Sequence, residues 1–93
     1  MMVFEVRFSR AAEKDLRKLP RPIVQVLNMW VRAVREEGLE EVRKCSGYHD
    51  EPLKGDRKGQ RSIRLTRAYR AIYEIRNDAI EFVLIMEVNK HEY

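Results

Sequence analysis

The sequence predicts a single α+β domain over residues 1–93, in which two helices precede a meander of strands. Three observations support this prediction. The first residues alternate between apolar and polar side chains, and residues 23–34 carry an apolar stripe at helical spacing. Residues 61–88 contain three β-rich stretches. The order β-α-α-β-β-β favours a helical hairpin packed on one face of a mainly antiparallel, four-stranded sheet.

The first strand and the first helix adjoin each other. Residues 3–9, VFEVRFS, alternate as a half-buried strand does. Ser9 can then cap a short helix over residues 10–19, because a serine hydroxyl accepts a hydrogen bond from a backbone N–H of the first turn. Pro20 ends this helix.

A longer helix is predicted between Pro22, which suits a first helical turn, and Gly38, which suits the position just past a helix end. Apolar side chains recur at i, i+4, i+7 and i+11 between them. They are Ile23, Leu27, Trp30 and Val34.

The segment between the helices and the later strands is predicted as an ordered loop. Residues 39–44 can form a short helical turn. Residues 45–60 contain three glycines and a proline, which are typical of loops. Functional residues are often carried by such loops on a rigid scaffold.

Three strands follow, over residues 61–66, 69–76 and 79–88. Asn77 and Asp78 are predicted to form the tight turn between the last two strands. The last strand is long and apolar, which favours a central place in the sheet.

A basic segment lies over these strands. Residues 54–70 contain seven Lys or Arg and one acid, whereas the rest of the chain carries 12 basic and 14 acidic residues. If Ile63 and Leu65 face the helices, Arg64 and Arg70 line the open face of the sheet. A local positive field of this kind suits a polyanion. A solvated, basic hairpin is the alternative.

The sequence also argues against several kinds of site and segment. Its single cysteine, Cys45, forms no internal disulfide, and its two histidines, His49 and His91, have no Cys/His cluster around them. No metal or other cofactor is therefore expected. No apolar run approaches the roughly 20 residues that span a bilayer, and the start of the chain has no pattern of a signal peptide. These observations favour a cytoplasmic protein that does not bind membranes.

The sequence contains the residue types that metal-free cleavage of RNA requires. In this reaction a 2′-hydroxyl attacks its own phosphate. Glu51, His49 and His91 are candidate acids and bases. Lys54, Arg64 and Arg70 can stabilise the charge of the transition state, and Tyr48, Tyr69 and Tyr93 can stack on bases. Taken alone, these residues indicate a basic α+β domain that binds RNA.

A family resemblance extends this interpretation. The stretch EPLKGDRKGQRSIRLTRAYRAIYEI and the ending KHEY resemble the RelE/ParE toxin superfamily of bacterial type II toxin–antitoxin modules, particularly its HigB-like members. The resemblance covers nearly the whole chain. RNA-cleaving members of the superfamily are ribosome-dependent endonucleases that cut mRNA. The resemblance therefore implies a cytoplasmic toxin that acts on mRNA and the ribosome and forms a hetero-oligomer with its antitoxin.

The resemblance also implies roles for single residues. Arg70 matches the arginine that contacts the scissile phosphate, and Lys54 matches a basic residue that stabilises it. Glu51 lies where some relatives carry a glutamate base, with His49 as a competitor. His91 and Tyr93 match the C-terminal residues used for proton transfer and base stacking, although Glu92 separates them here. The other cations of the segment are expected to bind RNA: Arg57, Lys58, Arg61, Arg64 and Arg67.

Two other functions remain open. A ParE-like toxin binds DNA gyrase and cuts nothing, and it shares the same fold. A relative without activity would be a plain RNA-binding domain. The coincidence of Glu51, Lys54, Arg70, His91 and Tyr93 favours the nuclease.

Overall fold

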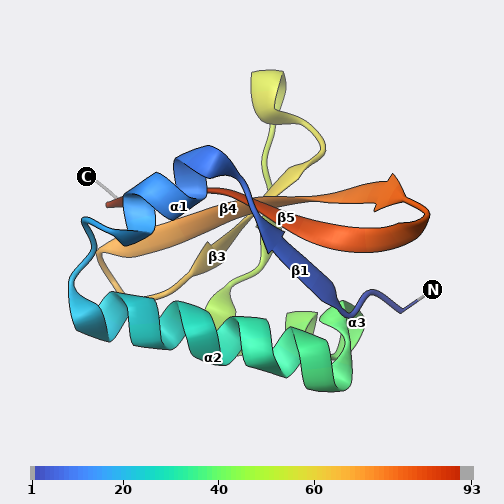
Figure 1. Ribbon diagram of the computed structural model, residues 1–93, viewed down its shortest axis with the longest axis horizontal. Helices are drawn as coiled ribbons and strands as arrows, with labels where there is room; N and C mark the ends of the chain where they lie inside the picture. Colours follow the sequence, from blue (N-terminus) through green and yellow to red (C-terminus); the bar gives the residue numbers. More distant parts are fainter. Residues whose placement is uncertain (1, 91–93) are drawn as a thin grey trace.

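The computed structural model describes residues 2–90 and consists of a five-stranded sheet packed against helices (Figure 1). The strands are β1 (Glu5–Phe8), β2 (Glu51–Pro52), β3 (Gln60–Arg64), β4 (Tyr69–Asp78) and β5 (Ile80–Lys90). The helices are α1 (Arg10–Leu16), α2 (Arg21–Glu37) and α3 (Leu39–Arg43), with short 3-10 turns η1 (Ser46–Tyr48) and η2 (Gly55–Arg57).

The sheet has the order β1-β5-β4-β3-β2. β1 is parallel to β5, and all other neighbours are antiparallel. The predicted α+β fold with a helical hairpin on one sheet face is confirmed, and β5 is central as expected. The predicted strand count of four is wrong by one, because the loop residues Glu51 and Pro52 pair with β3 as a short edge strand.

The ends of the helices follow the predicted signals. Ser9 caps α1, since its hydroxyl accepts a hydrogen bond from the Ala12 N–H at 3.0 Å. α1 ends at Leu16, three residues before the predicted end at residue 19. Gly38 ends α2 with φ of 91°, a backbone conformation that glycine adopts without strain. The predicted turn over residues 39–44 is present as α3.

The core lies between α2 and the helix-facing side of the sheet. The predicted α2 stripe is buried, and its Trp30 ring lies 5.3 Å from the Tyr73 ring, centroid to centroid. Ile63, Val83 and Ile85 complete this side of the sheet. These side chains belong to one hydrophobic cluster, so the residues described share a single core.

The β4–β5 hairpin differs from the prediction at its turn. β4 continues through Asp78, which pairs with Ile80, and Ala79 lies at the tip with φ of 67°. The prediction of an Asn77–Asp78 turn is therefore wrong, because both residues still belong to the ladder. None of the helices within residues 2–90 combines the length and apolarity needed to cross a membrane.

Candidate functional site

The face of the sheet away from the helices carries two rows of side chains. Arg64 lies opposite Arg70 on β4, and Arg70 lies opposite Asn89 on β5. Directly opposed residues of antiparallel strands share a face. The expectation that Arg64 and Arg70 share the open face is therefore confirmed. The neighbouring row contains Glu51, Ser62, Ile72 and Glu87.

A β-bulge in β5 sets which side chains reach this face. Ile72 pairs with Glu87 and Tyr73 pairs with Ile85, so Met86 is the extra residue. An extra residue reverses the alternation of a strand. Glu87 and Asn89 consequently lie beside Arg70 rather than in the core with Ile85.

α1 and its cap residue Ser9 bind the backbone of β5 at the bulge, beyond the last residue that pairs with β1. The Ser9 hydroxyl donates to the Met86 carbonyl at 2.7 Å, and the Asp15 carboxylate accepts from the Val88 N–H at 3.0 Å. These bonds satisfy the carbonyl of the extra residue and the N–H of Val88, two residues further on. The first helix therefore helps to fix the geometry of the open face.

Arg70 lies near the start of β4, the middle strand of the sheet. Its Nη1 donates to the Ser62 hydroxyl at 3.2 Å, and the Ser62 residue is only 1% exposed. A pocket of about 330 Å³ opens beside this pair. Its polar lining comes from Arg57, Ser62, Arg70, Asn89 and Lys90. Three cations, a hydroxyl and an amide are suitable partners for phosphate oxygens.

Arg57 reaches this pocket from the loop that carries η2, which projects from the sheet (Figure 1). Its Nη2 lies 2.5 Å from the Glu87 carboxylate, and its Nε donates to Gln60 at 2.8 Å. The Glu87 carboxylate also accepts from the Asn89 amide at 3.0 Å. A phosphate entering the pocket would compete with Glu87 for Arg57.

Arg61 lies on the opposite side of β3, where it pairs with Tyr73 in register. Its guanidinium Nε donates to the Asp50 carboxylate at 2.5 Å. The Tyr73 hydroxyl donates to the other oxygen of the same carboxylate. Burial, and then this carboxylate, raise the pKa of Tyr73 well above its usual range. RNA binding by Arg61 stays a prediction, and this placement favours a structural role.

Other predicted residues lie around the pocket. Glu51 is exposed on β2 and opposes Ser62, so it shares the face of Arg70, two strands away. His49 has φ of 46°, and its Nε2 lies 3.4 Å from Arg64 Nη1. Lys54, Lys58 and Arg67 are exposed in the loops that flank β3. The structure thus brings Arg57, Arg64 and Arg70 together with Glu51 on one face.

His91 and Tyr93 lie outside the described residues. Within residues 2–90, no three His, Cys, Asp or Glu side chains come together in a way that would hold a metal ion.

Sequence reasoning missed four residues of this site. Ser62 could have been found, because the alternation of RSIRLT places it on the face of Arg64. Glu87, Asn89 and Lys90 lie beyond the bulge, and an uninterrupted apolar strand gave no sign of a change in alternation.

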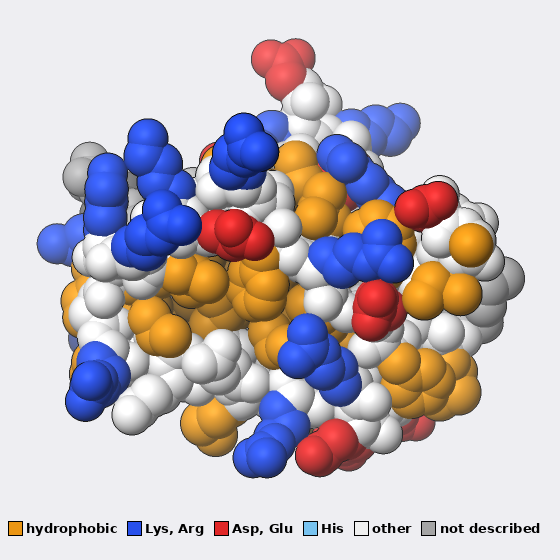
Figure 2. Space-filling view, viewed as in Figure 1, with side chains coloured by type: hydrophobic (Ala, Val, Ile, Leu, Met, Phe, Trp, Pro, Cys, Tyr) orange, Lys and Arg blue, Asp and Glu red, His pale blue; other side chains and the backbone are white. Residues whose placement is uncertain are grey.

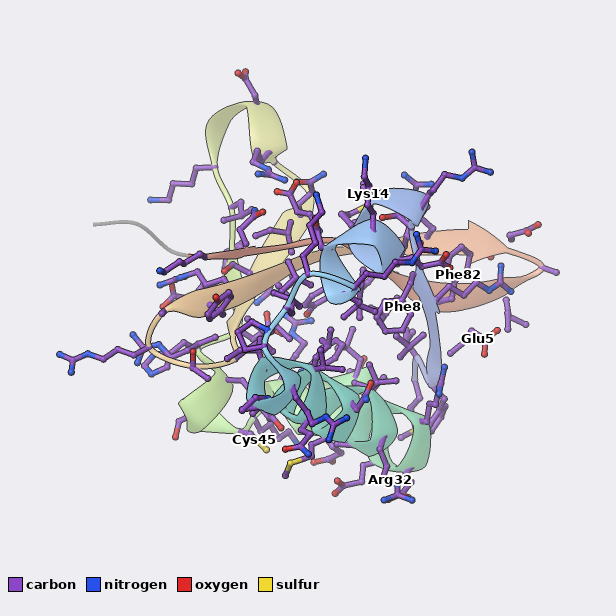
Figure 3. All side chains as sticks on the ribbon, turned by 60° about the vertical axis from the view of Figure 1, so that its left-hand side comes forward. Glu5, Phe8, Lys14, Arg32, Cys45 and Phe82 are labelled. Atoms are coloured by element: carbon purple, nitrogen blue, oxygen red, sulfur yellow. The ribbon has the colours of Figure 1, made fainter. Side chains whose placement is uncertain are left out.

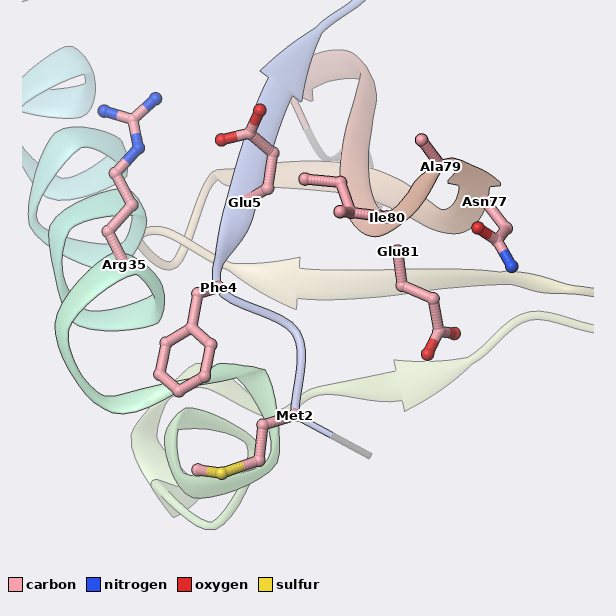
Figure 4. Close-up of a pocket in the computed structure, with 8 residues that line it drawn as sticks. All are labelled: Met2, Phe4, Glu5, Arg35, Asn77, Ala79, Ile80 and Glu81. Atoms are coloured by element: carbon pink, nitrogen blue, oxygen red, sulfur yellow. The ribbon is translucent and has the colours of Figure 1, made fainter.

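A larger pocket of about 640 Å³ lies elsewhere, between the start of β1, α2 and the β4–β5 tip (Figure 4). Met2, Phe4 and Ile80 give it an exposed apolar lining. Its charged residues are Arg35 and two acids, Glu5 and Glu81. This mixed charge does not suit a polyanion, so we place the candidate site at Arg70.

Comparison with known proteins shows which protein family this sequence matches. Residues 6–92 match a family model described as the ParE toxin of the type II toxin–antitoxin system parDE. Comparison with curated sequences gave no match.

Solved structures of other proteins share the fold of this chain. The chain resembles a YoeB/ParE toxin from Agrobacterium tumefaciens, with 19% identity and a TM-score of 0.71 over 95% of this chain and 99% of that chain. It resembles YafQ from E. coli, with 16% identity and a TM-score of 0.74 over 94% and 92%. A chain of the RelBE2 toxin–antitoxin complex from Mycobacterium tuberculosis is 28% identical, with a TM-score of 0.70 over 96% and 99%.

Proposed function

Because the chain belongs to the ParE toxin family, within the RelE/ParE superfamily of type II toxins, we propose that it is a ribosome-dependent endoribonuclease that cleaves translated mRNA. The observation that carries this proposal is the pocket around Arg70. Cations, a hydroxyl and an amide converge there on an open sheet face that can receive a single strand. The resemblance of the sequence to RNA-cleaving members supports the same activity.

The proposed reaction is an internal transesterification. The 2′-oxygen of one nucleotide loses its proton to a base and attacks the adjacent phosphorus, and the 5′-oxygen of the next nucleotide leaves with a proton. The products are a 2′,3′-cyclic phosphate and a 5′-hydroxyl. Arg70 contacts the scissile phosphate and stabilises the charge that develops on its oxygens. Lys54 is proposed to assist it from the adjoining loop.

Ser62 is a positioning residue in this proposal. Its buried hydroxyl accepts from Arg70 Nη1 and so limits the rotamers of the long arginine side chain. Arg57, Lys58, Arg64 and Arg67 would bind neighbouring phosphates of the strand, which positions the RNA without reading its sequence.

Proton transfer is assigned to Glu51, His49 or His91. Glu51 lies on the face of Arg70, and two strand spacings correspond to roughly 10 Å, which leaves room for a nucleotide between them. His91 and Tyr93 follow β5 and are proposed to complete the site, by proton transfer and base stacking.

The partners proposed are the ribosome with its mRNA and a cognate antitoxin, in the cytoplasm. The M. tuberculosis relative was solved as a toxin–antitoxin complex, and the E. coli DinJ–YafQ structure is another such complex. A basic face is expected to be inactive while an antitoxin is bound.

The second candidate function is inhibition of DNA gyrase, which the ParE description of the matching family favours. Mapping of mRNA 5′ ends after brief expression separates the two functions. A nuclease produces new 5′ ends within translated codons, and Arg70→Ala abolishes them. Arg76→Ala is the matched control, because Arg76 lies on the same strand and face, about 20 Å away. Growth arrest and DNA damage with intact transcripts would instead identify a gyrase inhibitor.

A further inference from the structure

Glu87 places a carboxylate against the polar lining of the pocket beside Arg70, which we call the Arg70 pocket. Its Oε1 accepts from Arg57 Nη2 at 2.5 Å and from the Asn89 amide at 3.0 Å. Arg57 and Asn89 both line the pocket, and Glu87 itself opposes Ile72, another lining residue, in the β4–β5 ladder. One carboxylate oxygen therefore binds donors of the pocket from two different segments of the chain.

The contact with Arg57 depends on a turn in the chain. Arg57 lies in η2, within the loop that projects from the sheet, as Figure 3 shows from a second side. Figure 2 shows Lys and Arg side chains around the base of this loop. Gly55 and Gly59, on either side of Arg57, have φ of 67° and 99°, which glycine adopts without strain. The two glycines allow the turn that directs Arg57 to Glu87 on β5.

The Glu87 charge remains beside any phosphate that the pocket binds. A guanidinium has five N–H donors, and the bonds to Gln60 and Glu87 use two of those of Arg57. A phosphate bound by Arg57 or Asn89 would lie roughly 5 Å from the Glu87 carboxylate, because each bond to a shared donor spans about 2.9 Å. This distance is shorter than the screening length of about 8 Å at physiological salt. Glu87 therefore repels the bound anion, whether or not Arg57 turns away from it.

The repulsion depends on the charge of the phosphate. Arg57, Arg70 and Lys90 attract every phosphate, and they attract a doubly charged one more strongly. Glu87 opposes this attraction in proportion to the same charge. A phosphodiester inside a strand carries one negative charge, whereas a terminal phosphate carries about 1.5 to 2 at pH 7. A carboxylate at this position therefore acts most strongly against terminal phosphates.

We propose that Glu87 is a specificity-determining residue, which lowers the affinity of the Arg70 pocket for terminal phosphates more than its affinity for internal phosphodiesters. This inference rests on the proposed function, because it takes the pocket to be the site that receives the phosphate of the RNA. The phosphorylated 5′ ends of RNA and free nucleotides would otherwise compete with the strand that is to be cut. The ion pair with Arg57 does not need a role in stability, since its side chains are 44% and 30% exposed and such pairs stabilise a fold only weakly.

The test compares methyl phosphate with dimethyl phosphate, which carry nearly two charges and one charge at pH 8. Their dissociation constants are measured at constant ionic strength from the NMR shifts of the Ser62 and Asn89 backbone amides. Glu87→Gln removes the charge and keeps an oxygen that accepts the same hydrogen bonds. In this variant we expect dimethyl phosphate to bind about 3-fold more tightly and methyl phosphate about 10-fold more tightly, because the repulsion doubles with the ligand charge.

Glu74→Gln is the matched control. The Glu74 side chain is 25% exposed and pairs with Arg76 at 3.2 Å, much as Glu87 pairs with Arg57. Glu74 lies on the same strand and face as Arg70, four residues or roughly 13 Å away. Screening at this distance should keep both dissociation constants within about twofold. Glu87→Asp keeps the charge and should keep the ratio of the two constants that the unmodified chain has.

Several results would overturn the inference: equal gains for both ligands in Glu87→Gln, weaker binding of both, the same change in Glu74→Gln, a ratio in Glu87→Asp that follows Glu87→Gln, or no binding of either ligand. The assay involves no cleavage and so separates this inference from the nuclease. A ratio set by Glu87 in a chain that cuts no mRNA would refute the nuclease and support the role of Glu87 in the pocket. Cleavage by a chain whose ratio is unchanged in Glu87→Gln would do the reverse.

Discussion

Asp50 is expected to be the most sensitive polar position in the described part of the domain. Its side chain is 2% exposed, and its two carboxylate oxygens bind Arg61 Nε and the Tyr73 hydroxyl. Its backbone carbonyl also accepts from Arg61 Nη2 at 3.3 Å. The side-chain bonds join the loop before β2 to both β3 and β4. Asp50→Ala removes both of them at once.

The expected loss of unfolding free energy follows from the groups that Asp50→Ala leaves unpaired. Loss of one member of a buried ion pair costs about 3–5 kcal/mol. The Arg61 side chain is 21% exposed and can regain water, which places the expected loss near the lower figure, about 3 kcal/mol. A small domain is stabilised by only about 5–15 kcal/mol, so this loss is large. Tyr73→Phe, which removes one hydrogen bond and leaves the ion pair, should cost about 1–2 kcal/mol.

Urea unfolding followed by Trp30 fluorescence measures both losses, because Trp30 is buried against Tyr73. The double variant should lose less than the sum of the single losses, since both substitutions break the same bond. A loss below about 1 kcal/mol for Asp50→Ala, or strict additivity, would refute the reasoning.

Three further predictions concern the contacts of Tyr73, Ser62 and Asp15. The raised pKa of Tyr73 means that the unfolded chain loses this proton first, so the free energy of unfolding should fall as the pH rises above about 10. Tyr73→Phe should make the fall less steep, and equal slopes in urea titrations from pH 9 to 11 would contradict this. Ser62→Ala should lower cleavage by about 10- to 100-fold in a kinetic assay, because Arg70 loses its buried anchor; an unchanged rate would remove Ser62 from the proposed mechanism. Asp15→Ala should cost about 1–2 kcal/mol and speed hydrogen exchange of the Val88 amide, and unchanged exchange would show that α1 does not hold the bulge.

The sequence predicted the elements of the fold that depend on local periodicity. The α2 stripe, the Ser9 cap and the burial of Ile63 and Leu65 were all visible as spacing, and they place Arg64 and Arg70 on the open face. Local spacing predicts these features because the periods of the helix and the strand fix which side chains share a face.

The remainder depends on pairing between distant segments. β2 contains only two residues, and nothing local distinguishes Glu51 and Pro52 from the loop around them. The bulge at Met86 results from the register of β4 against β5 and from the contacts of α1, so Glu87 and Asn89 could not be assigned to the site. The acidic partners of Arg57 and Arg61 also come from other strands or loops. The two arginines look alike in the basic segment of the sequence, but their surroundings differ in the structure.

The central claim is that Arg70 lies at the site where mRNA is cut. It is tested most directly with purified chain, ribosomes carrying a defined mRNA, and analysis of the RNA ends. We expect cleavage of ribosome-bound mRNA to a 2′,3′-cyclic phosphate and a 5′-hydroxyl, lost by at least 100-fold in Arg70→Ala and retained in Arg76→Ala. Intact mRNA with the unmodified chain, or equal cleavage by Arg70→Ala, would contradict the account.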